Sequence, residues 1–279
     1  MKTVLSTLLI TFLTCTVYAQ HYYNDLLTNA DFMKKRELYR LNKVKAVQYY
    51  SFDNNNQPIQ GFECEQTITN NFTLITTTTT APLSGTTRNI STFNANGQLM
   101  QQTDTSEGNK STLTYTYDAA GRITEVTSQS VSPGNYISGE RHLWYYSQDG
   151  KPSKMLKIKN SQDTTYISFI LDEQGNVAEE KPVYRGNQQP TTYYYYDDNH
   201  RLTDIVRYNA RAKKLLPDYI FEYTEKGQTA TMLVTAEGTG DYQKWYYTYD
   251  EKGLKSKDLC YSKTKVLIGK VEYKYQFLN

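Results

Sequence analysis

The side chains that most often carry out catalysis are scarce in this sequence. It contains three histidines, His21, His142 and His200. His21 lies close to the predicted end of a signal peptide, near Ala19, where we expect a mobile chain. His142 is typical of an ordinary strand residue. No spacing of Cys and His fits a metal centre, and residues 53–57 lack the glycine and the distal glutamate of a calcium loop. The sequence predicts no catalytic residue, no metal site and no cofactor.

Acidic residues recur at regular intervals, and their spacing bears on glycosidase chemistry. Such an enzyme holds two carboxylates about 5 to 9.5 Å apart on one cleft wall. In this chain the interval is explained by a repeat, which weakens a catalytic interpretation. No glycine-rich phosphate loop, nucleophile elbow or dinucleotide fingerprint is present. The acidic residues concerned are Asp118, Asp172, Asp197 and Asp250.

Aromatic residues offer a second kind of chemistry, the binding of sugar rings. The chain has 27 tyrosines and 2 tryptophans, and exposed flat rings suit a sugar face. The competing interpretation is that these rings pack a half-buried sheet, as Tyr and Trp often do. The candidate ligand-binding residues form two triplets, Trp144, Tyr145 and Tyr146, and Trp245, Tyr246 and Tyr247.

A recurring five-residue segment predicts the turns that position these residues. Its clearest copy runs from Tyr117 to Gly121, and its last position recurs every 24 to 29 residues. An Asp at the second position accepts hydrogen bonds from the backbone just ahead, and Gly at the fifth supplies a positive φ without a Cβ penalty. His200 replaces Gly in one copy, which favours a backbone role because His tolerates positive φ. The expected turn residues are Gly97, Asp118, Gly121, Gly150, Gly175, His200, Gly227 and Gly253.

A second series of Gly, Asn and Pro breaks falls between these turns and leaves strands of about seven to ten residues. We therefore predict an all-β chain of tandem β-hairpins, forming one long, twisted or coiled antiparallel meander sheet over residues 44–279. Its first strand should be Val44–Phe52, preceded by a short helix within Ala30–Arg40. The insert from Gln57 to Asn96 fits no repeat unit.

Two cysteines, Cys64 and Cys260, lie near the two ends of the predicted sheet. An open sheet of some fourteen strands at about 4.8 Å would separate them by roughly 65 Å. A disulfide requires Cα atoms within about 7 Å. We therefore expect two separate buried thiols, since a bridge would require the sheet to close.

The N-terminal residues predict export. Residues 1–19 combine a basic start, an apolar run and a small-residue cleavage box, so the signal peptide should end near Ala19. The segment 20–43 then precedes the repeat domain. A lipid anchor on Cys15 is the alternative, disfavoured because Thr14 stands where a small residue is expected. We expect a secreted, periplasmic or cell-surface protein with no integral membrane segment in the mature chain.

The charge and face patterns argue against two further classes, nucleic-acid-binding proteins and outer-membrane barrels. A formal charge of +2 with interleaved acids and bases gives no footprint for nucleic acid. An outer-membrane barrel would confine its aromatic residues to two girdles, whereas in this chain Tyr occurs throughout the strands. At the last strand, Glu272 and Lys274 alternate with Tyr273 and Tyr275. That alternation indicates one packed face and one wetted face.

One segment, GNKSTLTYTYDAAGRITEVT at residues 108–127, resembles the tyrosine-aspartate (YD) repeat of the RHS family. The signature positions are Tyr115, Tyr117, Asp118, Gly121, Arg122, Ile123 and Thr127. The resemblance implies a continuous, strongly coiled β-sheet, found in bacterial toxin shells and in cell-surface adhesion proteins, some with suggested carbohydrate binding. We expect a short form without a toxin domain, with too few strands for a closed shell around a cargo.

These features together predict an exported, non-catalytic bacterial β-repeat protein. Stacked repeats commonly present extended binding surfaces, so we expect a structural or protein-interaction module of the cell envelope or exterior. The alternative is a carbohydrate-binding module that uses exposed Tyr and Trp rings. The expected partner is a protein or a glycan of the cell envelope.

Overall fold

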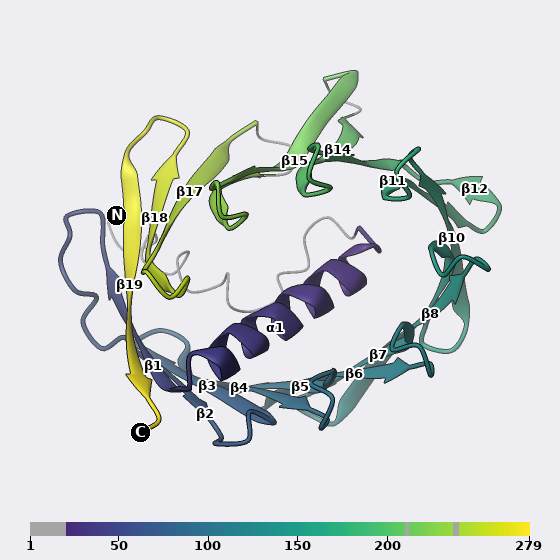
Figure 1. Ribbon diagram of the computed structural model, residues 1–279. Helices are drawn as coiled ribbons and strands as arrows, with labels where there is room; N and C mark the ends of the chain where they lie inside the picture. The colour runs from purple at the N-terminus through teal and green to yellow at the C-terminus, as the bar shows by residue number, and fades with distance from the viewer. Residues whose placement is uncertain (1–20, 210–211, 237–239) are drawn as a thin grey trace.

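The computed structural model describes residues 21–209, 212–236 and 240–279. In these ranges one antiparallel sheet closes on itself around a single helix, α1 (Asn24–Leu41) (Figure 1). The first strand, β1 (Val44–Phe52), pairs on one side with β2 (Glu63–Ile68) and on the other with β19 (Leu267–Phe277). The sheet is therefore a barrel of 18 strands.

The remaining strands follow in chain order, each paired with its neighbour. They are β3 (Leu74–Ala81), β4 (Gly85–Phe93), β5 (Leu99–Ser106), β6 (Asn109–Tyr117), β7 (Ile123–Ser132), β8 (Tyr136–Tyr146), β9 (Pro152–Lys159), β10 (Asp163–Leu171), β11 (Val177–Tyr184), β13 (Thr192–Tyr196), β14 (Leu202–Asn209), β15 (Lys214–Tyr223), β16 (Thr229–Thr235), β17 (Tyr242–Tyr249) and β18 (Lys255–Ser262). A short β12 (Asn187–Gln188) pairs only with the end of β11, and β11 also pairs directly with β13.

Closure corrects two expectations drawn from the sequence. The meander itself is confirmed, but an open sheet is wrong, and the strands are enough to form a closed wall. The insert from Gln57 to Asn96 supplies β2, β3 and β4, which continue the same meander and fill the space between β1 and β5. Pairing β1 with β19 satisfies the backbone groups that an open sheet would leave on two edges.

Closure of the sheet shortens the distance between the two cysteines but does not bring them within reach of a disulfide. Cys64 lies on β2 and Cys260 on β18, and both are buried and unbridged. Across the seam they are three strand spacings apart, or about 14 Å. That distance is still twice the reach of a disulfide.

The recurring five-residue segments form hydrogen-bonded turns at one end of the barrel strands. After β6, Oδ1 of Asp118 accepts the N–H groups of Ala120 and Arg122, each at 2.9 Å. The same pattern recurs at Asp172, Asp197 and Asp250. The fifth residue has a positive φ in every copy, at Gly97, Gly121, Gly150, Gly175, His200, Gly227 and Gly253.

Where a tyrosine opens a turn, its hydroxyl ties the turn to the preceding repeat, and Tyr275 of β19 makes the same kind of bond. Tyr117 donates its O–H to the carbonyl of Leu99 at 2.6 Å, and Leu99 is the first residue of β5. Every such bond ends on the carbonyl of the residue that begins a strand of the preceding repeat. The other pairs are Tyr146 with Ile123, Tyr196 with Val177, Tyr223 with Leu202, Tyr249 with Thr229 and Tyr275 with Lys255.

Removing one of these hydroxyls is expected to destabilise the barrel measurably. Tyr223→Phe deletes the 2.6 Å bond to Leu202 but keeps the ring, so we expect a loss of about 1 kcal/mol in the free energy of unfolding. The control is Tyr208→Phe, because the Tyr208 side chain is 51% exposed. Urea denaturation followed by circular dichroism measures both. Equal effects of the two substitutions would contradict a stabilising role for the tyrosine bonds.

Helix α1 lies inside the barrel and packs on one side against the wall (Figure 1). Asn29 donates to the Tyr117 hydroxyl at 2.8 Å, and Nε of the buried Arg36 donates to the carbonyl of Phe72 at 2.8 Å. Near the helix end, the Tyr39 ring contacts the edge of Tyr275. The helix begins six residues before the expected Ala30, because Glu180 of β11 accepts the N–H of Tyr23 at 2.8 Å. A contact so distant in sequence leaves no local signal.

The described residues contain no helix with both the length and the hydropathy needed to cross a membrane. The predicted signal peptide, residues 1–19, lies outside the described residues.

Candidate functional site

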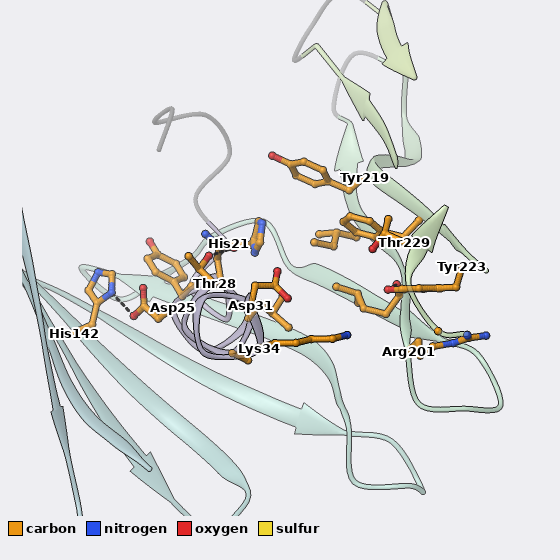
Figure 2. Close-up of a pocket in the computed structure, with 18 residues that line it drawn as sticks. His21, Asp25, Thr28, Asp31, Lys34, His142, Arg201, Tyr219, Tyr223 and Thr229 are labelled. Atoms are coloured by element: carbon orange, nitrogen blue, oxygen red, sulfur yellow. Dashed lines mark hydrogen bonds and ion pairs between the residues drawn. The ribbon is translucent and has the colours of Figure 1, made fainter. Parts of the chain in front are cut away.

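A cavity of about 540 Å³ lies inside the barrel, between α1 and the inner wall formed by β14 and β15 and the start of β16 (Figure 2). Pockets that hold small ligands commonly have volumes of about 300–1,000 Å³. The principal lining residues are His21, Asn24, Asp25, Leu27, Thr28, Asp31, Lys34, Arg201, Leu202, Ile205, Tyr219, Phe221, Tyr223 and Thr229.

The wall side of the cavity is aromatic. Successive side chains of a strand point to opposite faces, so Tyr219, Phe221 and Tyr223 of β15 all face the interior. The Tyr219 and Phe221 rings are nearly parallel, with planes 4° apart and centroids 6.1 Å apart. These stacked rings make this side of the cavity aromatic, and we call the surface the β15 platform (Tyr219, Phe221 and Tyr223).

The helix side of the cavity is polar. Asn24, Thr28, Asp31 and Lys34 are spaced by three or four residues, which places them on one face of α1. Asp31 is exposed to the interior space of the barrel, where reduced access of bulk water raises its pKa against the opposing effect of Lys34 and Lys255. The side chains of Asp31 and Lys34 make no hydrogen bond and no ion pair with another described residue. The cavity thus holds an acid and a base that are both free to contact a ligand.

His21 closes one end of the platform. Its ring meets the edges of Tyr219 and Tyr194 at centroid distances of 5.9 and 6.1 Å. This packing corrects the expectation of a mobile residue. Burial lowers the pKa of His21 to about 4, so the ring is neutral at physiological pH. Its Nδ1 is buried and has no hydrogen-bond partner among the described residues.

A second buried cluster holds the start of α1 against β8. His142 contacts Asp25 through Nδ1 at 2.6 Å and Glu140 through Nε2 at 2.8 Å. Trp144 donates its indole N–H to the same Asp25 oxygen at 3.0 Å, and Lys157 pairs with Glu140 at 3.0 Å. No sequence pattern indicates that these residues meet, because Asp25 lies more than 100 positions before β8.

The ionisation of this cluster follows from its pairs. Burial alone would lower the pKa of His142, but its bonds to Asp25 and Glu140 outweigh burial and raise it to about 9. Burial opposes ionisation of Glu140, whereas His142 and Lys157 lower its pKa to about 2. His142 is therefore a cation whose two nitrogens are both occupied. Its contacts join β8 to the start of α1.

Glu180 is a functional-site candidate that the sequence did not reveal. Its Oε2 accepts the N–H of Tyr23 and the hydroxyl of Tyr194 at 2.8 and 2.9 Å, while Oε1 has no partner among the described residues. Burial raises its pKa to about 7 despite these bonds. The neighbouring residues, Glu179 and Lys181, make the segment look like a solvated charge run. The carboxyl is buried because the Glu180 side chain points from β11 to the inside of the barrel.

The structure does not bring the two predicted aromatic triplets together. Strands β8 and β17 lie on different sides of the barrel (Figure 1). Trp144 and Trp245 point inward and are only 4% and 6% exposed, and Trp144 stacks on Phe169. These two rings therefore cannot present a flat face to an external sugar.

The tyrosines of the triplets divide between the two faces. Tyr145 and Tyr246 are exposed on the outer wall, but the ammonium groups of Lys154 and Lys244 lie over their rings, at 4.5 and 5.4 Å from the centroids. The other two make interior contacts: Tyr146 donates to Ile123 and Tyr247 donates to the sulfur of Met232.

Comparison with known proteins bears on the repeat. Residues 93–129, which span β5, β6 and most of β7, match the sequence model described as RHS Repeat. A search of curated proteins finds no match.

Solved structures give distant similarities. The Tc holotoxin pore of Photorhabdus luminescens matches with 15% identity and a TM-score of 0.34, over 77% of this chain and 12% of that one. The chain thus spans about an eighth of that protein. A porin-like protein from Bacteroides uniformis matches with 10% identity and a TM-score of 0.40, over 84% of this chain and 98% of that one.

The matched segment contains the Tyr117-Asp118 turn, whose bonds join it to the preceding strand and to its own backbone. The chain therefore carries an RHS repeat, and the predicted resemblance to the tyrosine-aspartate repeat proteins of the RHS family is confirmed.

Proposed function

We propose that this protein is an exported, non-catalytic β-repeat module of the cell envelope or exterior, and that its outer wall binds another protein. A row of apolar side chains across four neighbouring strands carries this proposal. Leu143 of β8 is in register with Leu156 of β9, which faces Tyr166 of β10, which faces Val183 of β11. We call this set the outer row (Leu143, Leu156, Tyr166 and Val183).

The direction of the outer row follows from its neighbours. Trp144, Met155 and Ile167 are buried in the interior, so the residues adjacent to them in sequence point outward. Tyr166 is 58% exposed, and Leu143, Leu156 and Val183 are half-buried around it. The row is bounded by Glu125 of β7 and Gln188 of β12. An exposed apolar strip with a polar rim is typical of protein-interaction surfaces.

The interior supports a non-catalytic role. Of the titratable groups on the inner wall, His142 contacts both Asp25 of α1 and Glu140 of β8. Their geometry fixes α1 inside the barrel and leaves His142 no free nitrogen for proton transfer.

Site-specific photo-crosslinking in the producing cells tests the outer wall. A photoreactive phenylalanine analogue at Tyr166 should give one defined protein adduct. The same analogue at Tyr208, a similarly exposed tyrosine outside the row, should give none. A second probe placed at Leu156 should give the same adduct. Adding Tyr166→Ser to that protein should remove the adduct while leaving its melting temperature nearly unchanged. Identical adduct patterns at Tyr166 and Tyr208 would contradict the proposal.

A glycan array tests the alternative function, the binding of carbohydrate. Selective glycan binding that survives Tyr166→Ser would favour a carbohydrate-binding module over a protein-binding one. Mass spectrometry of the protein recovered outside the cytoplasm tests export, with Gln20 expected as the first residue.

A further inference from the structure

The cavity inside the barrel has two walls of different chemistry that face each other. Asp31 and Lys34 extend from α1 toward the side where the β15 platform lies (Figure 2). The platform is aromatic, and its Tyr219 and Phe221 rings are stacked with nearly parallel planes. A ligand that fills this space needs charged groups on one side and a flat apolar group on the other.

The helix side indicates the charges of the ligand. Asp31 and Lys34 are three residues apart, one turn of the same helix face, and neither has an ion-pair partner among the described residues. A purely anionic ligand would be attracted by Lys34 but repelled by Asp31. A purely cationic ligand would be attracted by Asp31 but repelled by Lys34. A molecule that carries an ammonium and a carboxylate on neighbouring atoms satisfies both side chains at once, through charge-assisted hydrogen bonds.

The wall side indicates the rest of the ligand. Aromatic rings prefer offset-stacked or edge-on contacts with other rings, and the platform offers both a face and an edge. At its end, Nδ1 of His21 is buried and lacks a hydrogen-bond partner among the described residues. A phenol hydroxyl or an indole N–H of a ligand could complete that bond. The cavity volume of about 540 Å³ accommodates one such molecule with ordered water.

We propose that this cavity binds a free aromatic α-amino acid as its zwitterion. Asp31 pairs with the ammonium, Lys34 pairs with the carboxylate, and the side chain lies on the β15 platform. This site is independent of the outer row, so either proposal stands if the other fails.

Isothermal titration calorimetry of the full mature protein with L-phenylalanine and L-tryptophan tests the site. Two analogues separate the charges: phenylalaninamide lacks the carboxylate and N-acetylphenylalanine lacks the ammonium. Each should bind roughly tenfold more weakly than phenylalanine, because each leaves one side chain of the pair without its partner.

Matched variants assign each charge to a residue. Asp31→Asn should weaken phenylalanine binding roughly tenfold while leaving N-acetylphenylalanine unaffected, since that ligand has no ammonium to lose. Lys34→Met should weaken phenylalanine binding roughly tenfold while leaving phenylalaninamide binding unaffected, since that ligand has no carboxylate. The controls are Asp198→Asn in an exposed turn and Lys110→Gln on exposed β6, neither of which should change binding. Thermal melting of every variant checks that it is folded.

Three results would overturn the proposal. The first is the absence of binding heat for both amino acids with folded protein at millimolar concentration. The second is phenylalanine binding that neither Asp31→Asn nor Lys34→Met alters. The third is tighter binding of a neutral methyl glycoside than of either amino acid, which would assign the cavity to sugars.

Discussion

Replacing His142 by glutamine is expected to lower the free energy of unfolding by about 3 to 5 kcal/mol at pH 6. The substitution removes the cation that joins Asp25 of α1 to Glu140 of β8. Both carboxylates are largely buried, and breaking a buried ion pair by removing one partner typically has an effect of this size. Urea denaturation followed by circular dichroism provides the measurement.

His200→Asn is the control for the loss of a histidine, since Asn tolerates the positive φ of this exposed turn position. It should change the free energy of unfolding by less than about 0.5 kcal/mol. A loss below 1 kcal/mol in His142→Gln would show that the cluster does not hold the helix.

The same histidine makes stability depend on pH. Its pKa is raised in the folded protein from 6.5 to about 9, so its stabilising effect is complete below pH 6.5 and is lost as the pH rises to 9. The wild-type protein should therefore lose stability over this interval, by about 3 kcal/mol from this group. His142→Gln should show a flatter profile between pH 6.5 and 9.

Replacing Glu180 by glutamine is expected to remove a second, lower window of pH dependence. The side chain is fully buried and its pKa is raised from 4.5 to about 7. A raised pKa means that its favourable contribution is complete below pH 4.5 and is lost as the pH rises to 7. The wild-type free energy of unfolding should fall by about 3 kcal/mol across that window because of this group, and Glu180→Gln should lack this fall.

The adjacent glutamate supplies a matched control for that experiment. Glu179 pairs with Lys181 on the outer wall, so Glu179→Gln changes the same formal charge one position away without touching the interior. It should keep the wild-type pH profile. Parallel profiles for Glu180→Gln and wild type between pH 4.5 and 7 would contradict the assignment to Glu180.

Features of the structure that are set by local chemistry, such as the first strand and the turns, could be predicted from the sequence. The first strand begins and ends at Val44 and Phe52 as expected, because a periodic apolar pattern ends at the Asp53 turn. The positive φ at Gly121 and at His200 follows from residue type and interval alone. Contacts inside a turn span only a few residues, so the pattern that encodes them can be read directly.

Features of the structure that depend on distant contacts could not be predicted from the sequence. Closure of the sheet requires β1 and β19 to meet, and no local pattern encodes how strongly a meander coils. The helix begins at Asn24 because Glu180 binds the backbone just before it. The inward direction of Trp144 depends on the same closure, since the interior face exists only when the wall surrounds it.

Pairing the first strand with the last has a consequence for how the molecule folds. Val44 pairs with Phe277, so the final step of closure joins segments at opposite ends of the repeat domain and cannot occur until the whole chain is available. Contacts of such long sequence separation slow folding, because loop-closure entropy is lost before the contacts form. Until then the growing sheet keeps two free edges that can pair with another chain. A chain that ends before Leu267 should therefore keep those edges permanently and form aggregates rather than a smaller barrel.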